Sequence, residues 1–177
     1  MKKVYCILAA CQRCCVAFAP AVLIAAALLS GCGGGMSPRI GVGDRAPASN
    51  NLVVGDEADW RKVSTMDTRV PLYRWRIADL LEQRKPFLVV FGTPQHCTMC
   101  VDQIVRVAVM QETYGDRFAF IHVDGYKDND VWVEWGVRGE PWTFIVDATG
   151  TVTGVFPGQT EFAVLDRAIK AVLHETG

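Results

Sequence analysis

Short apolar runs and amphipathic stretches alternate along the second half of the chain. Phe87–Phe91 is an unbroken run of apolar residues, rich in valine and phenylalanine, which predicts a buried strand. A Gly92-Thr93-Pro94 break follows, and apolar residues then recur at helical spacing as far as Tyr114. The pattern therefore predicts that a strand passes into a helix close to residue 97.

Further segments have the length and period of helices or strands. We expect helices at 75–84, 129–135 and from a Thr160 cap to about His174, strands at 118–123, 142–146 and 152–156, and a hairpin turn at 147–150. Their order predicts one mixed α/β sheet, in which a right-handed crossover joins a parallel pair and a hairpin supplies an antiparallel pair.

Residues 48–74 have no clear period. The short apolar groups at 52–54 and 60–63 are weak strand candidates, and 67–71 favours a turn. Whether this segment extends the sheet or forms a separate lid is left open by the pattern.

The N-terminal segment has the pattern of an export signal. Lys2 and Lys3 precede an uncharged apolar stretch at 14–30, and Leu29-Ser30-Gly31-Cys32 resembles the lipobox of bacterial lipoproteins. That resemblance implies cleavage before Cys32 and lipidation of its thiol. An uncleaved anchor and an ordinary secretory signal are the alternatives.

Three regions are therefore expected: a lipoprotein signal at 1–32, a glycine-rich tether at 33–43 and one folded domain at 44–177. The domain would lie outside the cytoplasm, in a bacterial cell envelope, anchored to a membrane by Cys32. The whole chain has a formal net charge of −1 and no basic stripe, so a nucleic-acid partner is not expected.

Only two of the seven cysteines fall in the expected domain, Cys97 and Cys100; the others are Cys6, Cys11, Cys14, Cys15 and Cys32. In an oxidising compartment the two can pair with each other or with a partner. They stand at an expected helix N-terminus, where free N–H groups and the helix dipole should lower the pKa of the first thiol from about 8.5 towards about 3.5–7.5.

Two separated motifs resemble the thioredoxin superfamily. One is Cys97-Thr98-Met99-Cys100 after the first central strand, and the other is Trp135–Phe144, which is similar to the segment that holds a cis-proline, here Pro141. Gly43–Pro47 is similar to the entry motif of membrane-tethered relatives. The resemblance implies a thioredoxin-like fold, with a β-α-β-β-α core in a mixed sheet, flanking helices and an N-terminal extension.

The resemblance also implies the roles of the site residues. Cys97 would attack a partner disulfide, Cys100 would resolve the mixed disulfide, and Pro141 would fix the backbone that pairs with an extended substrate. The implied function is a membrane-anchored thiol:disulfide oxidoreductase, with reduction of protein disulfides as the favoured direction. It would act on protein thiols and disulfides of the envelope, with a redox partner protein and without a cofactor.

The chain departs from thioredoxin at several positions. Thr98-Met99 replaces Gly-Pro, His96 stands where a tryptophan precedes the first cysteine, and the buried aspartate of the proton path aligns with Val90 or its neighbour. His96 and Glu140 are the candidate modulators of the thiols, by lowering and raising their pKa respectively. The alternatives are a solvent-facing loop residue and a surface acid.

Two other functions stay open from the sequence. A soft-metal protein would bind an ion such as Cu(I) through Cys97 and Cys100, with His96 or His122 completing the site. The sequence favours a packed strand residue at His122, and no resident metal is expected under the leading interpretation. A scaffold on a thioredoxin-like fold is the other alternative.

Overall fold

The computed structural model describes residues 39–175. The signal and lipobox expected at 1–32, with Cys32, lie outside the described residues, and so does most of the tether expected at 33–43. Within the described part, Gly43 N donates to the carbonyl of Val152, and Val152 N donates to that of Asp44. No helix among residues 39–175 is long and apolar enough to cross a membrane.

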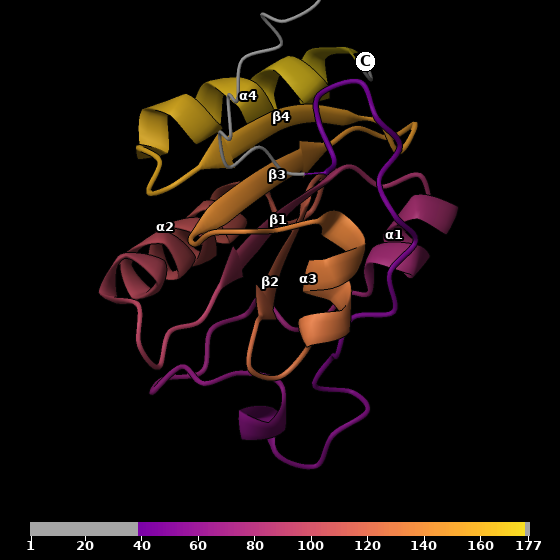
Figure 1. The fold of residues 1–177 in the computed structure, drawn as a ribbon. Helices are drawn as coiled ribbons and strands as arrows, with labels where there is room; N and C mark the ends of the chain where they lie inside the picture. Colours follow the sequence, from indigo (N-terminus) through magenta and orange to yellow (C-terminus); the bar gives the residue numbers. More distant parts are fainter. Residues whose placement is uncertain (1–38, 176–177) are drawn as a thin grey trace, which may run out of the picture. The chain divides into compact units, whose positions relative to one another are not determined.

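The centre of the molecule is a four-stranded sheet with the order β2-β1-β3-β4 (Figure 1). The strands are β1 (Phe87–Gly92), β2 (Ala119–Asp124), β3 (Trp142–Val146) and β4 (Val152–Pro157). β1 pairs with β2 in parallel and with β3 antiparallel, and β3 and β4 form the hairpin. The predicted mixed sheet is confirmed.

Helices cover both faces of this sheet, so two cores form. On one face, α2 (Thr98–Tyr114) and α4 (Phe162–Glu175) bury Leu88 and Val90 of β1. On the other, α1 (Ile77–Glu82) and α3 (Asn129–Trp135) bury Phe87, Val89 and Phe91. The alternation of odd and even positions along β1 therefore divides the apolar side chains between the two layers.

Residues 48–74 form no strand, so the weak candidates at 52–54 and 60–63 are wrong. A single 3-10 turn, η1 (Trp60–Lys62), forms in this segment. Side chains join this segment to the rest of the molecule: Leu52 N donates to Asp128 Oδ2 at 2.8 Å, and Asn51 Oδ1 accepts from Ile77 N at 2.7 Å. One backbone bond reaches β2, from His122 N to the carbonyl of Leu72. The apolar residues at 52–54 and 60–63 have β propensity, but they form no ladder with a strand of the sheet.

The same segment is bound closely to the end of β2. Thr65 donates to Asp124 Oδ2 through both its backbone N and its Oγ1, each at 2.6 Å. Thr65 Oγ1 also accepts from Gln95 N at 3.3 Å, in the turn that precedes α2. The segment therefore supports the loop between β1 and α2.

The predicted cap at Thr160 is wrong. α4 begins at Phe162, and the carbonyl of Glu161 accepts from Val164 N and Leu165 N. The backbone N of Thr160 instead donates to Oε1 of the buried Gln103 at 2.9 Å. Thr160 thus helps to join α2 to the chain entering α4.

Candidate redox site

The two cysteines lie where the chain leaves β1 and begins α2. Cys97 is the N-cap residue of α2, with extended backbone angles (φ −121°, ψ 97°), and its Sγ accepts from Cys100 N at 3.1 Å. The predicted position at a helix N-terminus is confirmed. Free backbone N–H groups and the positive end of the helix dipole therefore face the Cys97 sulfur.

Cys97 and Cys100 form a disulfide, with an S–S distance of 2.12 Å and a Cα–Cα distance of 5.2 Å. Their exposures differ: Cys97 is half-buried, whereas Cys100 is fully buried in the core between α2 and the sheet. Cys97 is therefore the more accessible residue of the two.

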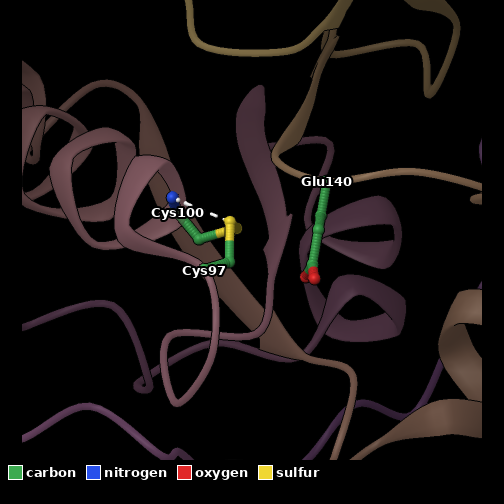
Figure 2. Close-up of side chains that lie close together, drawn as sticks. All are labelled: Cys97, Cys100 and Glu140. Atoms are coloured by element: carbon green, nitrogen blue, oxygen red, sulfur yellow. Dashed lines mark hydrogen bonds between the residues drawn. A yellow bond between two sulfur atoms is a disulfide. The ribbon is translucent and has the colours of Figure 1, made fainter.

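Glu140 reaches this disulfide from the loop between α3 and β3. The Glu140–Pro141 peptide bond is cis, as the resemblance implied. Figure 2 shows the Glu140 carboxylate beside the cysteine pair, and its oxygen and the two sulfurs all lie within 4.8 Å of one another. The residue before Pro141 thus places a negative charge at the sulfurs.

The two candidate modulators are brought together. His96 Nε2 lies 2.7 Å from Glu140 Oε1, and the His96 ring also packs against Tyr126, with centroids 5.2 Å apart. The side chain of His96 is 50% exposed and that of Glu140 is 18% exposed. His96 therefore contacts the carboxylate that lies beside the sulfurs.

His122 is a buried, hydrogen-bonded strand residue, as the sequence favoured. Its Nδ1 shares a hydrogen bond with the Tyr73 hydroxyl at 3.0 Å, and its Nε2 donates to the carbonyl of Gly92 at 3.0 Å. The Tyr73 hydroxyl in turn bonds to Ser64 Oγ at 2.9 Å. Burial lowers the pKa of His122, so the ring is held neutral beneath the site.

The histidines expected to complete a soft-metal site do not join the cysteines. His96 is bonded to Glu140, and both ring nitrogens of His122 are engaged. Glu140 is the third potential ligand beside the cysteines in the part of the chain that the structure describes. A carboxylate is a hard donor, which suits Cu(I) poorly.

Several supporting residues were missed from the sequence: Ser64, Thr65, Tyr73, Gln103 and Asp124. One signal could have found Asp124, which directly follows the second predicted strand. In the parallel pairing of β1 with β2, Asp124 lies opposite Gly92, at the end of the sheet where the loop to the cysteines begins. The others lie in the segment without a period or inside a helix, where no local pattern marks them.

Comparison with known proteins agrees with this geometry. A family model described as "Thioredoxin-like domain" matches residues 73–173. A "Thiol:disulfide interchange protein TxlA" from Synechococcus elongatus is 24% identical over 137 residues, which cover 70% of this chain and 71% of that protein.

Solved structures of similar fold match this chain with TM-scores below 0.5. A thiol:disulfide interchange protein of the thioredoxin family from Chlorobium tepidum has a TM-score of 0.49 and 22% identity, with 61% of this chain and 99% of that chain covered. Thioredoxin NaTrxh from Nicotiana alata has a TM-score of 0.47 and 21% identity, covering 53% and 78%.

The family match covers more than half of the chain and contains the cysteine pair, Glu140 and Pro141. It supports the thiol:disulfide oxidoreductase activity that the sequence predicted, with protein thiols and disulfides as the class of substrate. By this match, and with its mixed sheet and its disulfide at the start of α2, the chain belongs to the thioredoxin-like family.

Proposed function

We propose that this protein is a membrane-anchored thiol:disulfide oxidoreductase that reduces protein disulfides outside the cytoplasm. The observation that supports it most strongly is the Cys97–Cys100 disulfide at the N-terminus of α2, with a half-buried first cysteine and a fully buried second one. In this proposal Cys97 attacks the substrate disulfide, Cys100 resolves the mixed disulfide, and Pro141 presents backbone to the substrate chain.

Glu140 supports the reducing direction. A carboxylate beside two sulfurs disfavours the thiolate form by like-charge repulsion, and so favours the disulfide over the dithiol. A pair whose disulfide form is favoured passes its electrons on more readily. The helix N-terminus acts in the opposite sense, so the balance between the two effects decides the potential.

The reduction potential tests the direction. The chain would be equilibrated in detergent with glutathione buffers and alkylated, and the fraction reduced would be measured on the peptide that contains Cys97 and Cys100. We expect a two-electron transition below about −230 mV, in the reducing part of the superfamily range of about −270 to −120 mV. A value near about −120 mV would instead assign the protein as an oxidant, and absence of a reversible disulfide would refute the redox function.

The anchor and the location rest on the sequence before residue 33. If Cys32 is lipidated, labelled palmitate should be incorporated into the wild-type chain and not into Cys32→Ser, and only the wild type should be recovered in the membrane fraction after signal cleavage. Equal labelling of the two chains would refute the anchor without affecting the redox function.

A further inference from the structure

Glu140 has one satisfied carboxylate oxygen and one that is buried without a partner. Oε1 is paired with His96 Nε2 at 2.7 Å. Oε2 is buried and has no hydrogen-bond partner among residues 39–175. A buried polar atom without a partner is unfavourable by about 1–3 kcal/mol, and more when it is charged, so its retention requires an explanation.

The disulfide state holds no thiol proton that Glu140 Oε2 could accept. One carboxylate oxygen of Glu140 and both sulfurs lie within 4.8 Å of one another, and neither sulfur carries hydrogen while the two are bonded. Once the pair is reduced, a buried Cys100 thiol stands in the same place. Resting distances in catalytic sites are often longer than those in the reacting state.

Cys100 needs such a group because it has no access to solvent. Cys100 lies in the first turn of α2 and is fully buried in the core between this helix and the sheet. A thiol must lose its proton before it can attack a disulfide. Water cannot take that proton directly at this position. The position where thioredoxin has its buried aspartate is Val90 here or a neighbouring apolar residue, which cannot take it either.

The other charged groups near the site are already engaged. His122 of β2 uses both ring nitrogens, on Tyr73 and Gly92. Asp124 accepts from Thr65 through Oδ2 and from Tyr126 N through Oδ1. His96, from the turn before α2, is bonded to Glu140 itself. Among the described residues, Glu140 Oε2 is thus the buried side-chain atom that has no hydrogen-bond partner.

We propose that Glu140 is the general base for Cys100, and that His96 is the positioning residue that binds Oε1 and leaves Oε2 facing the sulfurs. This rests on the proposed function. In the mixed disulfide, Cys100 gives its proton to Glu140 Oε2 and its thiolate attacks Cys97 Sγ. The Cys97–Cys100 bond forms, the bond from Cys97 to the substrate sulfur breaks, and the departing substrate thiolate takes the proton from Glu140. The protein loses two electrons and the substrate gains two.

A chromogenic aryl disulfide, dithiobis-nitrobenzoate, separates the two steps. The reduced full chain in detergent, with the five cysteines outside the pair replaced by serine, should release one coloured thiolate when Cys97 attacks and a second when Cys100 resolves. Stopped-flow absorbance measures both, and the second rate should not depend on reagent concentration. The wild-type resolving rate should change little around neutral pH.

Glu140→Gln should slow the second release by about 100-fold at neutral pH, with the first release within about threefold of wild type. Its second rate should also rise about tenfold per pH unit, because hydroxide then removes the proton. His96→Ala should slow the second release by a smaller factor. Glu112→Gln, at an exposed position of α2, is the matched control and should behave as wild type.

An unchanged second rate and pH profile in Glu140→Gln would overturn the general base. If that variant does not fold, His96→Ala decides, and a wild-type resolving rate and pH profile in it would overturn the proposal. Failure of the wild-type chain to release the second thiolate would instead refute the redox function on which the proposal rests.

Discussion

Gly92 packs directly against Cys100. A Cβ built on Gly92 would lie 3.0 Å from the Cβ and 3.3 Å from the Sγ of Cys100. Gly92 also presents its carbonyl to His122 Nε2, so the last residue of β1 touches the resolving cysteine on one side and the buried histidine on the other. The backbone at this point sets the position of Cys100.

Gly92→Ala should therefore overpack the site. We expect the free energy of unfolding to fall by about 1–3 kcal/mol, because the added methyl group must displace Cys100 and the start of α2. Urea denaturation of the oxidised chain measures it. Gly55→Ala is the control, since a Cβ added there would have no atom within 4 Å and the residue has no positive φ; equal destabilisation by both changes would contradict the packing explanation.

Tyr73→Phe removes the hydroxyl that lies between Ser64 and His122. Because it leaves a buried ring nitrogen unpaired, we expect a loss of about 1–3 kcal/mol in the free energy of unfolding. Tyr126→Phe is the comparison, since Tyr126 is largely exposed and should change stability by less than about 0.5 kcal/mol. Similar effects of the two changes would show that the buried hydroxyl does not stabilise the fold.

Stability should decrease at acidic pH because of His122. Burial lowers its pKa in the folded state, so below about pH 6.5 the unfolded chain takes up a proton that the folded chain does not. The contribution is fully present above about pH 6.5 and declines by up to about 1.4 kcal/mol per pH unit below it, until the pH reaches the folded-state pKa.

Urea denaturation of the wild type and of His122→Gln, at about pH 7.5 and about pH 5.5, isolates this effect. The variant is less stable at the higher pH because it loses buried hydrogen bonds, but the difference between the two chains should shrink at the lower pH. A difference that stays constant would mean that His122 is not held neutral.

Cys100→Ser should trap substrates. With the resolving thiol gone, the mixed disulfide between Cys97 and a partner has no route to resolution within the chain. Cell extracts run without reductant should show high-mass adducts that disappear on reduction. Both variants would be made in a chain whose five other cysteines are replaced by serine. Cys97→Ser is the matched control and should give no adducts, because the remaining Cys100 is buried; adducts of equal amount from both variants would contradict the assigned roles.

The elements near the cysteines could be predicted because their signals are local. The apolar run of β1, its glycine-proline break and the helical spacing of α2 each fall within a short window. The structure confirms the strand and the helix, and the break begins one residue later than predicted, because β1 includes Gly92. The position of Pro141 depended on a family resemblance, since no local pattern distinguishes a cis from a trans proline bond.

The contacts that complete the site could not be predicted, because they join distant parts of the chain. The His96–Glu140 pair connects the turn before α2 to the loop before β3. The bonds from Thr65 to Asp124 and Gln95 depend on a segment whose path is set by polar side chains rather than by a period. The short apolar groups at 52–54 and 60–63 have strand propensity, but they form no ladder with a strand of the sheet.

The contacts of Thr65 have a consequence for how this protein can be divided. The family match begins at residue 73, yet Thr65, Met66 and Leu72 lie before it and contribute to the loop support and to the core beside α2. The homologous unit is thus smaller than the folding unit. A fragment cut at the family boundary would keep every residue proposed for the chemistry while losing part of the structure that supports the cysteine loop.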